Sequence, residues 1–176
     1  MTDSRRMFFK WTLYVVTLLL TAVFQTVVMG SWKIFGVHPN IFPVLVAVVA
    51  LVEGPYGGAA FGFATGVVCD AFMNPAEGFF MIIFMITGLF LGAAGEYLFK
   101  RNIFTALLFS LASMAIENVL FFTFFVLLPG KASIYALWTV ALPEILFSTL
   151  FMPVIYALIK YISKKLTRKK ESIYPL

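Results

Sequence analysis

The stretch that decides the fold is PNIFPVLVAVVALVEGPYGGAAFGFATGVVCD, residues 39–70. Its two apolar runs are separated by Glu53, Gly54 and Pro55. Because Gly and Pro end helices and a carboxylate prefers a polar boundary, this tripeptide predicts a tight turn. We therefore expect a helical hairpin, with a short first arm over residues 39–52 and a longer second arm over residues 56–72.

Four more apolar runs flank the hairpin, and each is close to the roughly 20 residues that a helix needs to cross a bilayer. They cover residues 11–29, 79–97, 103–128 and 134–159. The chain is 62% hydrophobic and 12% charged, whereas a soluble domain is about 45–50% apolar and about 25% charged. Residues 1–160 therefore predict an all-α integral membrane protein, a bundle of six transmembrane helices, followed by a basic tail at 161–176.

The hairpin allows a second arrangement, in which four helices span the membrane and residues 39–72 form a re-entrant loop. The short first arm permits this arrangement, and the turn carries no basic residue that would decide between the two. The second arm carries no charge before Asp70, which favours a true crossing because a charge inside the bilayer is costly. We expect six spans.

The basic residues predict the orientation of the bundle, because cytoplasmic loops carry an excess of Lys and Arg. With the N-terminus inside, all of the 13 basic residues except Lys33 and Lys131 fall on the cytoplasmic side. The opposite orientation would invert this bias. We expect a multi-pass protein of a bacterial plasma (inner) membrane, with both termini in the cytoplasm.

Small residues recur every four positions in two ladders. The first consists of Gly54, Gly58, Gly62 and Gly66 and leads to Asp70; the second consists of Gly88 and Gly92 and leads to Glu96. Glycines at this spacing leave a strip of helix without side chains, so that another backbone can approach closely. The ladders, with Pro55, therefore predict either helix packing inside the bundle or a groove for a partner's helix.

The carboxylates that end the two ladders can each be explained by a structural role. Asp70 is either an interfacial group that reaches lipid headgroups or Lys33, or a group that locks a helix or contacts a partner. Glu96 has Lys100 four residues later, which is the spacing of an ion pair on one helix face.

Glu117 and Glu144 are the residues of the sequence that cost the most free energy to place in a membrane. Counted from the inner ends of two antiparallel helices, both lie near mid-membrane, with Asn118 beside Glu117. An ionised side chain at this depth costs about 2.5–3.5 kcal/mol, so such residues face the bundle interior. Three readings stay open: a polar clamp between the last two helices, a buried contact for a partner's helix, and a proton or cation relay.

The sequence contains no residue set that is typical of an enzyme or of a metal site. It has one Cys, one His and no zinc, nucleophile-elbow or phosphate-binding motif. The net charge of +5 comes mostly from the C-terminal tail, so it concerns membrane orientation and not nucleic acid. We expect no catalytic activity, no cofactor, no metal and no nucleic-acid partner.

The order of these features resembles the bacterial rod shape-determining MreD family. The residues that carry the resemblance are Pro39, Asn40, the turn with Gly54 and Pro55, the ladder Gly58, Gly62 and Gly66, then Asp70, the loop Asn74 to Gly78, and the pair Gly88 and Gly92. They cover residues 39–95. The segment from Phe79 to Met81 departs from the smaller aliphatic residues of that pattern, and Glu117 and Glu144 have no counterpart in it.

The resemblance implies a fold similar to the six-helix substrate-binding S-components of energy-coupling-factor vitamin transporters. It implies a non-enzymatic scaffold of the cell-elongation machinery that binds MreC in the lipid bilayer. Through MreC, the scaffold would help couple cytoplasmic MreB to the elongation peptidoglycan synthase and so regulate peptidoglycan synthesis and cell shape. The alternative is a substrate-binding subunit of a vitamin or ion transporter, which the same fold and the pair Glu117 and Glu144 motivate.

Overall fold

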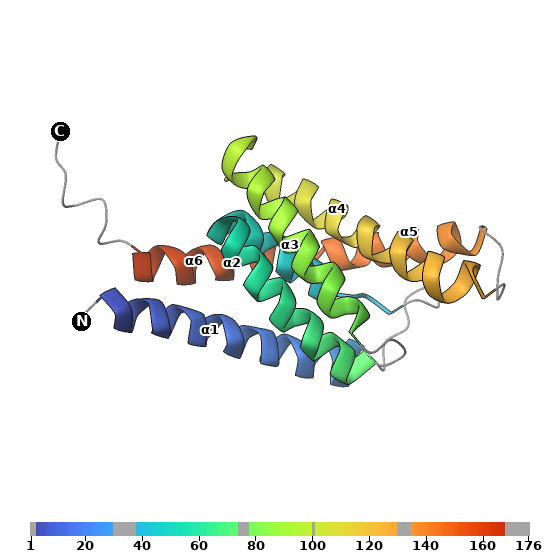
Figure 1. Ribbon diagram of the computed structural model, residues 1–176, viewed down its shortest axis with the longest axis horizontal. Coiled ribbons are helices and arrows are strands. Elements are labelled where there is room, and N and C mark those ends of the chain that lie inside the picture. Colours follow the sequence, from blue (N-terminus) through green and yellow to red (C-terminus); the bar gives the residue numbers. More distant parts are fainter. Residues whose placement is uncertain (1–2, 30–37, 74–77, 100, 130–134, 168–176) are drawn as a thin grey trace.

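The computed structural model describes residues 3–29, 38–73, 78–99, 101–129 and 135–167, and in these residues it contains helices and no strand (Figure 1). The α-helices are α1 (Asp3–Phe24), α2 (Phe42–Met73), α3 (Phe79–Tyr97), α4 (Ile103–Phe122), α5 (Tyr135–Thr149) and α6 (Met152–Thr167). Two π-helical turns, η1 (Gln25–Met29) and η2 (Thr123–Leu127), continue α1 and α4. The predicted all-α class is confirmed.

Helices α1, α2, α3 and α4 are each long and apolar enough to cross a membrane. Helices α5 and α6 make a fifth span if the pair, which is bent by 46°, counts as one. The protein therefore has the composition of a membrane helical bundle, while the number of six spans stays a prediction.

The expected turn lies inside α2, where the helix is broken at Gly54 (φ 83°, ψ −170°). This backbone conformation is essentially restricted to glycine. The arms on either side fold back on each other, because a Cβ atom added to Gly58 would lie 2.8 Å from the Cβ atom of Ala50. The predicted helical hairpin is therefore confirmed, although its first arm begins at Phe42 and residues 39–41 are not helical.

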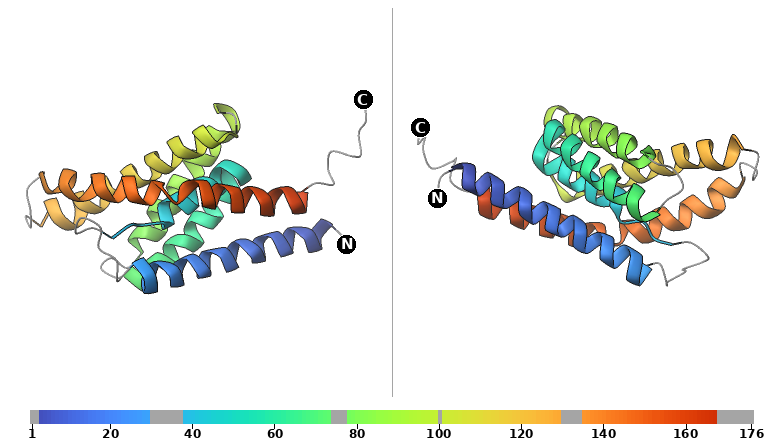
Figure 2. Two further views of the ribbon diagram at one scale, coloured as in Figure 1. Left: turned by 180° about the vertical axis from the view of Figure 1, so that it is seen from behind. Right: turned by 60° about the horizontal axis from the view of Figure 1, so that its bottom comes forward.

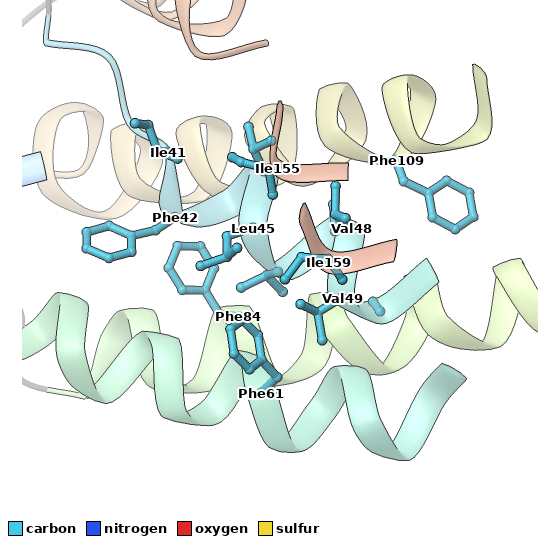
Figure 3. Close-up of a cluster of buried hydrophobic side chains, with 14 of the residues drawn as sticks. Ile41, Phe42, Leu45, Val48, Val49, Phe61, Phe84, Phe109, Ile155 and Ile159 are labelled. Atoms are coloured by element: carbon cyan, nitrogen blue, oxygen red, sulfur yellow. The ribbon is translucent and has the colours of Figure 1, made fainter. Parts of the chain in front are cut away.

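The first arm of α2 forms the centre of the bundle. Every side chain from Ile41 to Leu51 is buried. Figure 3 labels Ile41, Phe42, Leu45, Val48 and Val49 of these, in one cluster with Phe61 of the second arm, Phe84 of α3 and Ile159 of α6. Residues 42–53 rise about 18 Å at 1.5 Å per residue, which is well short of the roughly 30 Å hydrocarbon core. The first arm is thus a half-helix enclosed by protein.

The two glycine ladders meet each other, backbone to backbone, between the second arm of α2 and α3. A Cβ atom on Gly58 would collide with the carbonyl oxygen of Gly88, and one on Gly92 would collide with the carbonyl carbon of Gly54. Further along, Gly62 and Gly66 lie against the backbone of Phe84 and Met81 in the same way. Packing inside the bundle is therefore what these glycines do in this chain.

Asp70 locks the start of α3 to the end of α2. Its carboxylate accepts hydrogen bonds from the backbone N–H groups of Phe80 (3.2 Å) and Met81 (3.1 Å). These donors belong to the first turn of α3, whose N–H groups have no partner within the helix. Of the two predicted roles, the helix-locking one is what the structure describes. Lys33 and Lys100, the suggested partners of Asp70 and Glu96, lie outside the described residues.

The turn of α2 is tied to two other helices through Glu53. Its carboxylate forms an ion pair with Lys10 of α1 (2.6 Å) and accepts hydrogen bonds from the hydroxyls of Tyr14 (2.6 Å) and Ser163 (3.2 Å). Glu53 therefore joins α1, α2 and α6 at the end of the bundle where the first and last helices carry their basic residues. Figures 1 and 2 show the start of α1 and the end of α6 at this same end.

The helix expected over 134–159 is broken near its middle. Helix α5 ends at Thr149, and α6 begins at Met152 and continues to Thr167, within the expected tail. Pro153 explains the break, because its nitrogen carries no hydrogen for a bond to the carbonyl four residues earlier. Pro143, in contrast, is accommodated inside α5.

Candidate functional site: a polar cavity inside the bundle

A cavity of about 310 Å³ lies at the start of the first arm of α2. Six of its eight lining residues carry polar side chains, and the full set is Gln25, His38, Asn40, Phe80, Glu117, Asn118, Phe121 and Glu144. These residues come from η1, the segment before α2, and helices α3, α4 and α5. A polar cavity of this size can hold several water molecules or a small ligand.

Asn40 connects three parts of the bundle at this cavity. Its backbone N–H donates a hydrogen bond to the hydroxyl of Ser148 on α5 (2.8 Å), and its side-chain amide donates to Glu117 on α4 (3.3 Å). Its side-chain oxygen accepts from the N–H of Phe42 at the start of α2 (3.2 Å). Asn suits this place because its short side chain readily bonds backbone two residues on.

Gln25 holds the non-helical backbone before α2. Its amide nitrogen donates to the carbonyl of Pro39 (2.5 Å), and its amide oxygen accepts from the N–H of Ile41 (3.2 Å). Backbone without helical hydrogen bonds is tolerated at membrane depth where protein groups satisfy it. Gln25 is the first residue of the π-helical turn η1, and such turns occur frequently at functional sites.

Glu117 is the most buried acidic group of the cavity, with 5% of its surface exposed. One carboxylate oxygen accepts from Asn40, and the other accepts from the amide of Asn118 (3.3 Å). Asn118 also donates to the carbonyl of Met114 (3.1 Å), which fixes its side chain on α4. Both carboxylate oxygens of Glu117 therefore have hydrogen-bond partners inside the protein.

Glu144 lines the same cavity from α5, and the amide of Asn118 interacts with it. The structure therefore brings together the three intramembrane polar residues that the sequence singles out. No Lys or Arg is among the described residues that line this cavity. The N–H of Phe42, at the positive end of the α2 helix dipole, donates to the cavity-lining Asn40, and this end of the helix favours a negative group.

Among its described lining residues, the cavity offers hydrogen-bonding groups and two carboxyl groups, and no Ser, Thr, Cys or Lys side chain. In the described part of the chain, no three His, Cys, Asp or Glu side chains are grouped so that they could hold a metal ion. What the arrangement can do is hold water, bind a small polar or cationic species, or clamp the helices that meet there.

The predicted site residues therefore fall into two separate sets. Glu117, Asn118 and Glu144 line the cavity, whereas none of the ladder glycines does. Sequence reasoning did not single out Gln25 or Ser148 and noted Asn40 only as part of a pattern. Gln25 could have been found from the sequence, because a polar residue in an otherwise apolar span indicates a functional site.

No protein-family model, curated protein or solved structure matches the chain.

Proposed function

We propose that the protein is a non-enzymatic scaffold of the bacterial plasma membrane, of the kind that its resemblance to the MreD family implies. In this role it binds the bitopic protein MreC and helps couple cytoplasmic MreB to the elongation peptidoglycan synthase. The observation that carries the proposal is that the residues of the resembling pattern serve the architecture of the bundle.

Three parts of that pattern have a mechanical role in the described structure. Gly54 allows the sharp break in α2, the ladders let α2 and α3 meet backbone to backbone, and Asp70 holds the start of α3. Close backbone packing of this kind gives a pair of membrane helices one fixed geometry. A rigid helix pair with little chain outside the membrane is suited to presenting a constant surface to a partner.

The ladders themselves are not available to that partner, because each one is covered by the other within the same chain. A partner's helix therefore has to use the outer surface of the bundle. Among the four helices that are each long and apolar enough to span, α1 has the smallest buried share: 17% of the residues in its apolar window are buried, against 61% for α2.

The test is capture of the tagged protein from gently solubilised membranes of a rod-shaped bacterium, with identification of the proteins that accompany it. We expect recovery of MreC, and we expect cells depleted of the protein to become round. Unchanged cell shape under confirmed depletion, together with capture of no MreC, would contradict the proposal.

A substrate-binding subunit of a vitamin or ion transporter is the second candidate. The polar cavity favours it, because many transporters bind their substrate inside the membrane at the N-terminus of a half-helix. In that case the captured protein would bring a transporter ATPase with it, and a small molecule would stay bound through purification. Recovery of MreC without an ATPase would exclude this reading.

A further inference from the structure

A second hollow, which we call the α1–α6 groove, has a volume of about 860 Å³ and is lined almost entirely by apolar side chains. Helix α1 contributes one stripe that includes Phe9, Val16 and Leu20, and α6 contributes a facing stripe that includes Leu158. From Phe9 to Phe24 the groove runs about 22 Å along α1, at 1.5 Å per residue.

The two hydroxyl groups in the middle of the groove already donate hydrogen bonds within α1, so a bound molecule need not supply acceptors for them. Thr17 donates to the carbonyl of Leu13 and Thr21 donates to the carbonyl of Thr17, each at 2.8 Å. An occupant of the middle of the groove therefore needs no polar groups, which excludes a polar solute and suits a hydrocarbon chain.

The two ends of the groove differ. At one end, the rings of Phe24 and Phe151 meet edge to face with their centroids 6.3 Å apart, which connects α1 to α6 there. At the other end lie Tyr161 and Lys165, and Lys165 is the only charged side chain among the described residues of the lining. Lys165 donates a hydrogen bond to the Tyr161 hydroxyl (3.4 Å) and stays exposed, whereas the nearby Lys10 is engaged by Glu53.

This shape distinguishes between the possible occupants. A spanning helix needs about 30 Å of surface and would have to continue past the contact between Phe24 and Phe151. A slot that is apolar along its length, obstructed at one end and basic at the other matches an amphiphile with a hydrocarbon chain and an anionic head. Basic residues at the membrane surface attract the anionic lipids of the adjacent leaflet.

We infer that the α1–α6 groove binds an anionic phospholipid of the leaflet at the basic end of the bundle. One acyl chain lies between the stripes of α1 and α6, and the headgroup phosphate lies at Lys165. The inference requires only that the bundle sits in a membrane, and it does not depend on the proposed partner.

The test is native mass spectrometry of the full-length protein in detergent, with dioleoyl phosphatidylglycerol as the anionic probe and dioleoyl phosphatidylcholine as the neutral one. We expect the anionic lipid to remain bound at a defined stoichiometry and the neutral lipid to bind several-fold more weakly. Lys165→Gln should weaken binding of the anionic lipid about fivefold, the effect of one basic charge at the interface, while Lys164→Gln, outside the groove, should change it little.

The chain offers a matched pair for the apolar part of the groove. Val15 and Val16 are neighbours on α1 with the same exposure of 44%, but only Val16 lines the groove. Val16→Trp should abolish tight binding of the anionic lipid and Val15→Trp should leave it unchanged. Leu158→Trp fills the groove from the opposite wall and should repeat the loss if Val16→Trp fails to fold.

Three results would overturn the inference. The first is equal binding of both lipids, and the second is equal loss in the Val15 and Val16 variants. The third is that groove-filling variants lose a captured protein or a second copy of the chain while lipid binding is unchanged.

Discussion

Gly62 and Gly66 lie where the α3 backbone leaves no room for a side chain. A Cβ atom on either residue would collide with backbone atoms of Phe84 or of Met81. These contacts are with main chain, which moves only if the helices separate. The requirement for glycine at these two positions is therefore steric.

We predict that Gly66→Leu separates α2 from α3 and lowers the stability of the protein by about 1–3 kcal/mol or more, as for overpacking of a core. The matched control is Val67→Leu, because Val67 is the next residue and is exposed. Thermal unfolding of both variants in detergent checks this. If Gly66→Leu were as stable as the wild type, the glycine ladder would not be required for the packing of α2 against α3.

At Glu117, two substitutions can separate the effect of the side chain's charge from the effect of its shape. Gln at this position fills the same space and keeps one acceptor for the amide of Asn40, while the amide of Asn118 loses its bond to residue 117 but keeps the carbonyl of Met114. Leu, in contrast, leaves the Asn40 donor without a partner. If Glu117 acts as a clamp, Glu117→Gln changes stability by less than about 1 kcal/mol and Glu117→Leu costs about 1–3 kcal/mol.

The measurement is thermal stability together with recovery of cell shape in depleted cells. Loss of cell shape in Glu117→Gln cells with normal expression and stability would show that the negative charge itself is used. That result would favour the relay or transport reading of the cavity.

At the scale of the helices, Glu53 is the group that sets the position of α1 relative to α2 and α6. Its three partners, Lys10, Tyr14 and Ser163, come from the other two helices. The sequence identified Glu53 only as part of a turn. The partners that make it a junction lie 39 and 110 residues away along the chain for the two hydroxyls.

We predict that Glu53→Ala loosens α1, because three donors lose their common acceptor at a cost of about 1–3 kcal/mol. Spin labels at the exposed Thr12 of α1 and Lys164 of α6 measure the result as a broader distance distribution between the two helices. Lys160→Ala, which removes an exposed charge of α6, serves as the control. An unchanged distribution in Glu53→Ala would mean that apolar packing alone positions α1.

How much the sequence could predict depends on the range of the interaction. The break at Gly54 and the ladders are local patterns, and they identified both the α2 hairpin and the glycines on which α2 and α3 pack. The hydrogen bond from Asn40 to Ser148 spans 108 residues, and apolar periodicity does not reveal which helix faces meet. The same limit applies to the enclosure of the first arm, since a buried helix and a lipid-facing helix are equally apolar.

At the scale of the whole molecule, the start of α1 and the end of α6 lie at one end of the bundle (Figures 1 and 2). The basic residues predict that this end is cytoplasmic. We expect a fluorescent protein fused to either terminus to fold and fluoresce in the cytoplasm.

The same orientation requires that a cysteine introduced at Ala76, in a Cys69→Ser background, reacts with an impermeant thiol reagent from outside the cell. Protection of that cysteine, or activity of an alkaline phosphatase fused to the C-terminus, would reverse the orientation.

The enclosed first arm of α2 has a consequence for how the protein is made. The arm is synthesised early, but α4, α5 and α6, which surround it and supply Glu117 and Ser148, leave the ribosome much later. Until then, the backbone N–H and the side-chain amide of Asn40, just before the arm, lack their final partners in a medium that offers few others. Assembly of the centre is therefore a late, post-insertion event, and a chain truncated before α5 should be recognised by membrane proteases as unfinished.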